Sequence, residues 1–306
     1  MRQHLRFYRH RWFKAWLAMT ALSAALIIMM EAVGNHAVRP AAFFYGAAAG
    51  PMALLVAVHD RTGIGTSVPG VTLVGMFLFG GGVALLLGGY FDSLLIPDGA
   101  SLDILRVGWI EEPAKLVPIL ALALTGRHLT KAAGVALGLS CATGFAVMES
   151  MSYAWKNVDK DSAVGAGVVL FTRGLTTPFG HLVWTGMVCA IAFEVWHLAG
   201  RVVFTVTIAC AFTVAATLHS INDGLLVLDV PAPVRLLFPV VAAVSYWLFH
   251  QATGDLSPRV PGGAAALAVR IATPPGLRPP AGEFAVRITA PPGLQPPAGA
   301  PPGRPA

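Results

Sequence analysis

Acidic side chains with a nearby lysine interrupt a stretch of the sequence that is otherwise apolar. Glu111 and Glu112 are adjacent, and Lys115 follows Glu111 by four residues, so a helix places Glu111 and Lys115 on one face. Glu112 is rotated by about 100° from that face and can contact another group. Neighbouring carboxylates repel each other and burial favours their protonated form, so one of the pair can exchange a proton near neutral pH. This pattern is typical of a general base that activates water while Lys115 stabilises the charge of the other carboxylate.

Histidines supply a second set of reactive groups. His219 and Asp223 are four residues apart and Asn222 lies between them, so all three side chains line one helix face. His181 adds an imidazole from another segment, and Glu149 adds a carboxylate from a third. Two histidines and a carboxylate are a ligand set that Zn²⁺ accepts in hydrolases, so a zinc site at His181, His219 and Glu149 is one interpretation. A metal-free glutamate–histidine site that activates water fits the residue types equally well.

The segments that carry these residues are expected to span a membrane. Hydrophobic residues make up 56 % of the 306-residue chain and charged residues only 12 %, about half the charged fraction of a usual soluble domain. Apolar runs of roughly 20 residues, enough to cross a bilayer as a helix, recur along the chain. Because backbone inside lipid has to form its own hydrogen bonds, the fold class is all-α, a polytopic helical membrane protein. About eight transmembrane helices are predicted, at Trp16–Gly34, Ala41–Val58, Val68–Tyr90, Ile104–Leu124, Ala132–Met151, Leu175–Trp196, Val202–Leu226 and Val234–His250.

One stretch is too long for a single crossing. Ala163–Leu198 contains 36 residues, including Arg173. The sequence leaves open whether residues 163–173 span the membrane, re-enter it or lie at its interface.

The last part of the chain has a different composition. Residues 253–306 are rich in proline, glycine and alanine, and the segment Val269–Gly282 recurs as Val286–Gly299 with a period of 17 residues. Such a segment cannot bury enough apolar surface to fold. We therefore expect a membrane domain of residues 1–252, with its reactive helices at about 104–226, followed by a disordered tail.

The distribution of basic residues predicts the orientation of the chain. The net charge of +6 does not indicate nucleic-acid binding, because five basic residues precede the first apolar run and anchor it in the cytoplasm. These residues are Arg2, Arg6, Arg9, Arg11 and Lys14. After eight crossings the tail is also cytoplasmic, in what we expect to be the plasma membrane. The ionisable residues of four spans then lie within about 15 Å of the outer surface.

This shared depth favours a functional site. A charge in the hydrocarbon region costs at least ~2.5 kcal/mol even on the gentlest scale, so several such groups are stable only around shared partners or a water-filled cavity. An isolated polar contact between helices would explain one residue, but it does not explain acids and histidines at matched depth on four helices.

Four short motifs, in this order, resemble those of the PrsW family of intramembrane proteases, which is distantly related to the CAAX-processing and bacteriocin-immunity membrane proteases. They are Glu111-Glu112-x-x-Lys115, Phe145-Ala-Val-Met-Glu149, His181-Leu-Val-Trp184-Thr185 and His219-Ser-Ile-Asn222-Asp223. Each motif is short, but one on each of four successive helices is a fairly specific combination. The resemblance covers roughly Trp109–Asp223.

The resemblance implies hydrolysis of a peptide bond in a membrane-anchored protein at the outer face of a bacterial plasma membrane. Family members make the first cleavage of anti-sigma factors in regulated proteolysis. It also implies roles for single residues. Glu111, Glu112, Lys115, Glu149, His181 and His219 would form the catalytic group, supported by Trp184, Asn222 and Asp223.

Two other functions are compatible with an ionisable cluster in a membrane. A proton-coupled transporter or channel also uses Glu and His side chains. Transporters, however, place their site at the midplane within repeats, whereas this cluster is off-centre and the spans show no repeat. A catalytically inactive scaffold is the second alternative, and the retention of every acid and histidine in the motifs argues against it.

Overall fold

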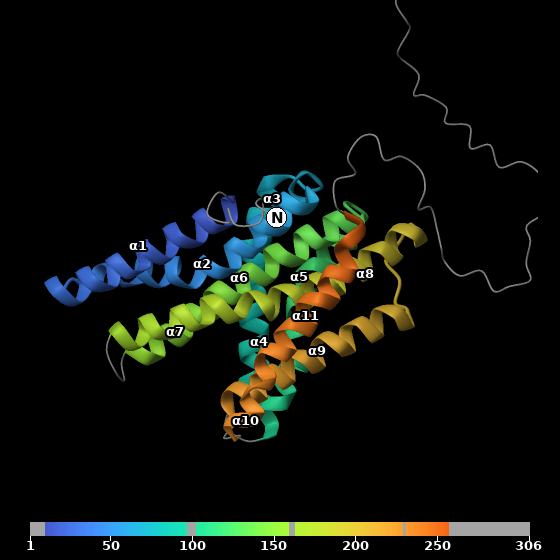
Figure 1. The fold of residues 1–306 in the computed structure, drawn as a ribbon. Coiled ribbons are helices and arrows are strands. Elements are labelled where there is room, and N and C mark those ends of the chain that lie inside the picture. Colours follow the sequence, from blue (N-terminus) through green and yellow to red (C-terminus); the bar gives the residue numbers. More distant parts are fainter. Residues whose placement is uncertain (1–9, 97–101, 159–162, 229–230, 257–306) are drawn as a thin grey trace, which may run out of the picture. The chain divides into compact units, whose positions relative to one another are not determined.

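The structure, a computed structural model, is built from helices. It describes residues 10–96, 102–158, 163–228 and 231–256, and these ranges contain no strand. The longer helices are α1 (Arg11–Val33), α2 (Arg39–Thr62), α4 (Gly81–Leu95), α5 (Val107–Ala123), α6 (Lys131–Val158), α8 (His181–Ala199), α9 (Val206–Val227) and α11 (Leu237–Thr253) (Figure 1). The shorter ones are α3 (Gly70–Gly75), which continues through a π-helical turn at Met76–Gly80 into α4, α7 (Ala163–Thr176) and α10 (Ala232–Arg235). The predicted all-α fold class is confirmed.

Most of the predicted spans are long and apolar enough to cross a membrane. Six such stretches occur among the described residues, at Arg11–Val33, His36–Thr62, Gly70–Leu95, Lys131–Val158, Val164–Ala199 and Pro233–Leu256. The two predicted spans outside this set are α5, which has 17 residues, and α9. Both carry ionisable residues, which lower their average hydropathy. The polytopic helical architecture is thus confirmed, and eight is an approximate count. The tail predicted for residues 253–306 lies outside the described residues from position 257 onward.

Hydrogen bonds between helix ends show which ends of α1, α2 and α11 lie close together. Arg11, at the start of α1, donates to Asp60 near the end of α2 at 3.1 Å. The neighbouring Arg61 donates to the hydroxyl of Thr253, at the end of α11, at 2.8 Å. The first described helix therefore begins at the same end of the helical domain at which the last long helix ends.

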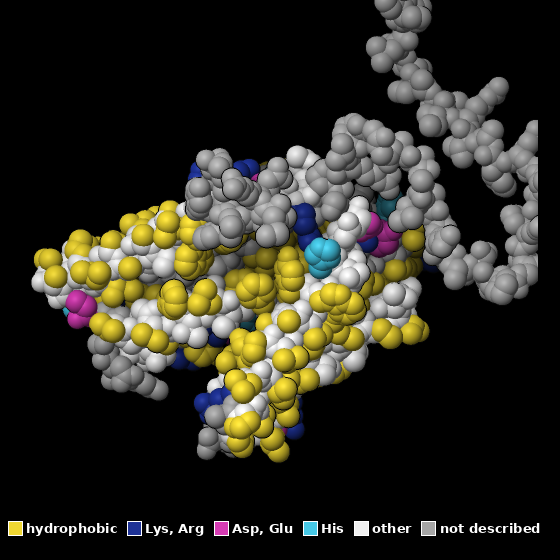
Figure 2. Space-filling view, viewed as in Figure 1, with side chains coloured by type: hydrophobic (Ala, Val, Ile, Leu, Met, Phe, Trp, Pro, Cys, Tyr) yellow, Lys and Arg dark blue, Asp and Glu magenta, His cyan; other side chains and the backbone are white. Residues whose placement is uncertain are grey.

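Large apolar side chains cover much of the molecular surface. Phe79 is 77 % exposed, Leu86 71 % and Val206 80 %. Figure 2 shows hydrophobic side chains spread over α1 and α11, with charged groups gathered toward the ends of the helices. Water would solvate such a surface poorly, whereas lipid tails match it. By contrast, 83 % of the most apolar window of α6 is buried, so α6 forms the centre of the domain.

The predicted span Leu175–Trp196 is interrupted, which corrects the prediction of one continuous helix. A single 3₁₀ turn at Thr177–Phe179, followed by Gly180, separates α7 from α8. Pro178 has no N–H to continue the helical hydrogen bonds, and Gly180 adopts a non-helical backbone with φ −110° and ψ −105°. His181 is therefore the first residue of α8 rather than a residue inside a longer helix.

Both halves of this broken helix remain within the bundle. α7 packs against α6 and α2, and α8 packs against α6. Figure 1 shows α2, α6 and α7 side by side. The stretch Val164–Ala199 therefore follows α6 as one broken helix that is long and apolar enough to cross a membrane.

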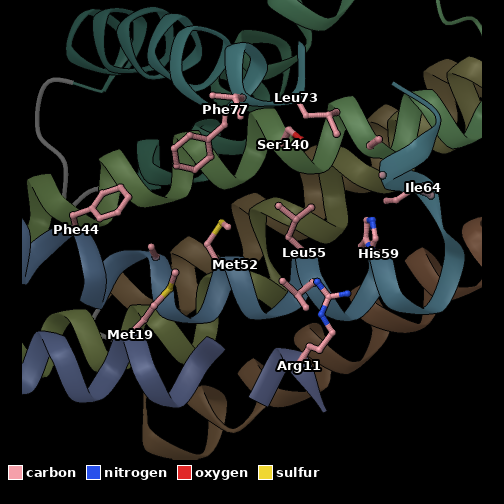
Figure 3. A pocket seen from close by; sticks show the side chains of 15 residues that line it. Arg11, Met19, Phe44, Met52, Leu55, His59, Ile64, Leu73, Phe77 and Ser140 are labelled. Atoms are coloured by element: carbon pink, nitrogen blue, oxygen red, sulfur yellow. The ribbon is translucent and has the colours of Figure 1, made fainter. Parts of the chain in front are cut away.

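An apolar groove runs along α2 (Figure 3). Its volume is about 410 Å³, and Met52, Leu55 and Phe77 are among the side chains that line it. Arg11 and His59 lie at one end of the groove. None of the residues predicted to be reactive borders it.

Candidate active site

The predicted reactive residues come together from four helices. α6 carries Glu149, which is half-buried. The other five residues are Glu111, Glu112 and Lys115 of α5, His181 at the start of α8 and His219 in the second half of α9. All five are buried, although they are ionisable. Buried charges are stable only when paired and hydrogen-bonded, so their contacts define the site.

Lys115 lies at the centre of the cluster and has no exposed surface. Its ammonium group donates to Glu112 Oε1 at 2.9 Å and to Glu111 Oε2 at 3.3 Å. It also lies 2.9 Å from His181 Nδ1, and 4.2 Å above the ring of Phe145. The pairing predicted for Glu111 is present, but Glu112 shares the same lysine, because a flexible side chain reaches partners three and four residues back on its helix.

Glu112 is held by three donors. Besides Lys115, His219 donates from Nδ1 to Oε1 at 3.0 Å, and the hydroxyl of Thr185 donates to Oε2 at 2.9 Å. These contacts come from α5, α9 and α8. Both oxygens are therefore occupied, and Glu112 joins three helices in one hydrogen-bonded network.

The other ring nitrogen of His219, Nε2, is buried and is not held by a hydrogen bond from the described residues. It lies 3.5 Å from Glu111 Oε2 and 3.5 Å from Asp223 Oδ2. Asn222, the alternative partner of His219 in the sequence, donates to Asp223 at 3.1 Å instead.

Trp184 holds the His219 ring in position. The two rings stack, with their centroids 4.6 Å apart and an angle of 25° between their planes. The indole N–H donates to the hydroxyl of Ser245 on α11 at 2.8 Å. Trp184, predicted to support the site, thus connects His219 to α11, a helix that none of the four sequence motifs covers.

His181 is contacted at both ring nitrogens. Nδ1 faces Lys115, and Nε2 lies 3.2 Å from Glu149 Oε2. Glu149 also forms an ion pair with Arg173 of α7. Since a charged lysine can only donate, Nδ1 is the accepting nitrogen and Nε2–H donates to the carboxylate.

The donor types and spacing of one group fit a metal ion. Among the described residues, Glu111, His181 and His219 each offer one ligand atom, and these atoms lie within 4.8 Å of one another. The unpartnered His219 Nε2 is a suitable ligand atom. Its opposite nitrogen donates to a carboxylate, as in most metal-binding histidines. The residues therefore fit a divalent cation, for which His181 would have to exchange one of its two contacts.

The carboxylate of this group differs from the predicted one. The sequence combined Glu149 with the two histidines, whereas the structure groups Glu111 with them. Glu149 contacts His181 Nε2 at 3.2 Å and also pairs with Arg173, and the zinc set that includes Glu149 stays a prediction.

A cavity of about 820 Å³ opens beside the cluster. Glu111, Glu149 and His181 line it, whereas Glu112 and Lys115 do not. The adjacent glutamates thus differ in environment: one borders the cavity and the other is enclosed by protein.

Two residues that line this cavity, Asp92 and Arg173, were not assigned to the site by the sequence analysis. Asp92 of α4 lines it, and its buried Oδ1 has no hydrogen-bond partner among the described residues. The predicted span ended at Tyr90, one turn too early, so Asp92 was not placed on the helix. Arg173 was noticed only as a charge in a long apolar stretch, and the signal that could have indicated its role is the acid required to pair with it.

Close packing of α5 on α9 brings the two parts of the cluster together. A Cβ atom on Gly108 would lie 2.1 Å from the carbonyl oxygen of Ala216 and 2.9 Å from Cβ of His219. Any larger residue would separate the helices, so glycine at this position lets His219 reach Glu112.

Comparison with protein families agrees with this geometry. The family model described as PrsW family intramembrane metalloprotease matches residues 68–249, more than half of the chain. The match includes every residue of the cluster, and α1 and α2 lie outside it. No curated protein and no solved structure matches the chain. On the strength of the family match, the chain belongs to the PrsW family of intramembrane metalloproteases.

Proposed function

We propose that this intramembrane protease hydrolyses a peptide bond of a membrane-anchored protein in the cavity beside Glu111. The observation that carries the proposal is the arrangement of Glu111, His181 and Glu149 along one cavity wall, with Lys115 and Glu112 buried behind them. A protease needs a space that admits substrate and water next to a group that takes up a proton. The 820 Å³ cavity provides this space.

Glu111 is the residue proposed to accept the proton of the attacking water. Of the two adjacent glutamates, it is the one that borders the cavity, and it lies 3.5 Å from His219 Nε2. Its present hydrogen bond from Lys115 is long, at 3.3 Å, which leaves the carboxylate available to a water molecule.

Glu112 and Lys115 are proposed to keep the reacting groups in place. Glu112 fixes His219 in the tautomer that presents Nε2 toward Glu111, because it accepts the proton of Nδ1. Lys115 balances the charge of both glutamates and contacts His181. Preorganised groups of this kind lower the barrier because they do not have to reorient during the reaction.

A divalent cation is proposed to be held by His181, His219 and one carboxylate oxygen of Glu111, which leaves the other oxygen of Glu111 to accept the proton of the attacking water. The family description names a metalloprotease, and Zn²⁺ is the cation that this donor set suits best. A cation bound there would make a coordinated water more acidic and would polarise the carbonyl of the scissile bond.

The substrate is proposed to be a single-span membrane protein, with an anti-sigma factor in regulated proteolysis as the specific candidate. The support for a membrane substrate is that the cavity is formed by helices whose outer surface is apolar. The support for an anti-sigma factor is the resemblance of the four motifs to those of the PrsW family.

The protein is proposed to lie in the plasma membrane with its N terminus and its C-terminal tail in the cytoplasm. The basic residues before the first apolar run favour this orientation. The end of α11 adjoins the start of α1 through Arg61, Asp60 and their partners, so both termini of the helical domain lie on one side.

Two measurements test the proposed function. Membrane fractions of cells that produce the wild type or Glu111→Gln are compared by mapping protein N termini. The wild type should generate new N termini in single-span proteins, and the variant should not. The purified wild type should hold about one zinc ion per chain, and chelation should stop cleavage of a fluorogenic single-span peptide library in liposomes.

Identical N termini with wild type and Glu111→Gln would overturn the proposed site. Full activity after complete removal of metal would overturn the role of the cation while leaving the glutamate–histidine chemistry in place.

A further inference from the structure

We propose that Arg173 is a positioning residue for the reaction, and that the α1–α2 hairpin acts on the site by holding Arg173 in place. The inference rests on the proposed function, because it concerns how Glu149 and His181 are oriented. It assigns a catalytic purpose to two helices that lie outside the family match.

The guanidinium of Arg173 lies across one face of α6. It pairs with Glu149, its Nε–H donates to the hydroxyl of Ser150 at 2.9 Å, and it lies 4.4 Å above the ring of Tyr153. A planar group with several donors can make these contacts together, whereas a lysine ammonium cannot reproduce them. The position of the Glu149 side chain therefore depends on α7, which carries the arginine.

Glu149 transmits this arrangement to the reactive cluster. The oxygen that pairs with Arg173 is also the oxygen that lies 3.2 Å from His181 Nε2. His181 in turn meets Lys115 through its other nitrogen. Without the arginine, Glu149 would be free to turn into the cavity, and His181 would lose the acceptor that fixes its ring and its tautomer.

α2 supports α7 at the residue next to Arg173. A Cβ atom on Gly50 would lie 1.5 Å from the carbonyl oxygen of Gly174 and 3.0 Å from Pro178. One turn earlier, a Cβ on Gly46 would lie 3.1 Å from Leu170. The backbones of α2 and α7 are therefore in direct contact through glycines four residues apart, which is typical of tightly packed helices in membranes.

α1 in turn packs against α2 and so supports the helix that holds α7. The hydroxyl of Ser23 on α1 donates to the carbonyl oxygen of Ala42 at 2.8 Å. The hairpin contributes no residue to the cavity. The hairpin also packs on α6 through α2, but its contact with α7 is the one that lies next to Arg173.

The first test replaces the arginine. In liposomes, initial rates are measured on a fluorogenic single-span peptide that the wild type cleaves. Arg173→Gln should lower kcat by about 10- to 100-fold with KM within about threefold, as expected when a residue that orients a ligand or an acid is lost. Arg173→Lys should recover part of the rate, because it restores the charge without the planar group.

The second test replaces the support. Gly50→Ala should lower kcat like Arg173→Gln, whereas Gly75→Ala, a helical glycine with nothing within 4 Å of its Cβ position, should leave kcat unchanged. The double variant of Gly50→Ala with Arg173→Gln should be no slower than Arg173→Gln alone, because both changes act through the same arginine.

The controls separate this inference from the proposed function. Melting temperature and elution volume in detergent identify variants that do not fold, and the remaining variants still decide the outcome. Wild-type kcat in Arg173→Gln would overturn the positioning role of the arginine, and additive losses in the double variant would overturn the role of α2, while Glu111→Gln stays inactive in both cases. If the wild type cleaves no peptide, or if Glu111→Gln is fully active, the proposed function fails instead.

Discussion

The cavity beside Glu111 and the groove beside Met52 are both bordered by α6, yet their linings have opposite chemistry. The cavity, of about 820 Å³, includes acids, a histidine and Arg173. The groove, of about 410 Å³, is lined mainly by apolar side chains, with Arg11 and His59 confined to one end. One helix thus supplies Glu149 to the first hollow and Ala136 to the second.

The difference shows what a buried charge requires in this fold. Every ionisable side chain of the cluster has an oppositely charged or hydrogen-bonding neighbour on the same or another helix, as for Lys115 with Glu111 and Glu112. Among the described residues that line the groove, the ionisable side chains are Arg11 and His59 at one end, so the rest of the groove accepts apolar groups. Substitutions in the cluster beside the cavity should therefore affect catalysis or stability strongly, and those in the groove should affect neither strongly.

Among the residues enclosed behind the cavity, the largest effect is expected for Glu112→Gln. The amide keeps the size of the side chain but removes the charge that binds Lys115 and His219. Cleavage of the single-span peptide should fall by about 10³-fold, within the range found for groups that orient or stabilise a reacting centre. Wild-type cleavage in the folded variant would contradict the contrast between the two regions, because the cluster beside the cavity would then tolerate the loss of a buried charge.

The next largest effect is expected for Lys115→Met, on stability. The substitution leaves two adjacent carboxylates buried without their cation, which should cost about 3–5 kcal/mol of unfolding free energy. Denaturation in mixed SDS and detergent micelles measures the loss. Leu55→Met in the groove is the matched control and should cost less than about 1.5 kcal/mol. An equal loss of unfolding free energy in Lys115→Met and Leu55→Met would contradict the proposed difference between the polar cluster and the apolar groove.

A smaller effect is expected for Trp184→Phe, which lies at the edge of the polar cluster. The change keeps a ring next to His219 but removes the hydrogen bond to Ser245, whose hydroxyl is left buried. Stability should fall by about 1–2 kcal/mol. Adding Ser245→Ala to Trp184→Phe should restore part of the lost stability, because it removes the unpaired hydroxyl. An unchanged stability of the double variant would argue against the lost hydrogen bond as the cause.

The smallest effect is expected for Met52→Leu in the groove. The two side chains have similar volume and no charge, so stability should change by less than about 1.5 kcal/mol and the cleavage rate should stay the same. Rate measurements on the same peptide provide the check. A large loss of activity would mean that the groove takes part in substrate binding.

Much of the site could be predicted because its residues stand out against an apolar background. Glu111, Lys115 and His219 were recognisable as ionisable residues inside spans, and the structure brings them within hydrogen-bonding range of shared partners. Their individual roles in the reaction stay predictions. The carboxylate that the structure groups with the two histidines is Glu111 rather than Glu149, because such a grouping depends on distances between helices; which residues bind a metal stays a prediction.

Helix ends were less predictable than helices. Asp92 belongs to α4 although the predicted span ended two residues earlier, and α8 begins at His181 although the predicted span began at Leu175. In each case the apolar average changes gradually along the chain. The boundary depends instead on local backbone geometry, such as the turn at Pro178 and Gly180.

Run length, hydropathy and motif order are properties of consecutive residues, so they were enough to predict a helical membrane protein with reactive groups on four helices. Three features required the packed structure: which glutamate of the adjacent pair borders the cavity, which carboxylate lies nearest both histidines, and the support of α2 for the helix that carries Arg173. These features depend on how each helix is rotated and how closely neighbouring helices approach. Contacts between distant residues, including the glycines of α2 and α7, set both quantities.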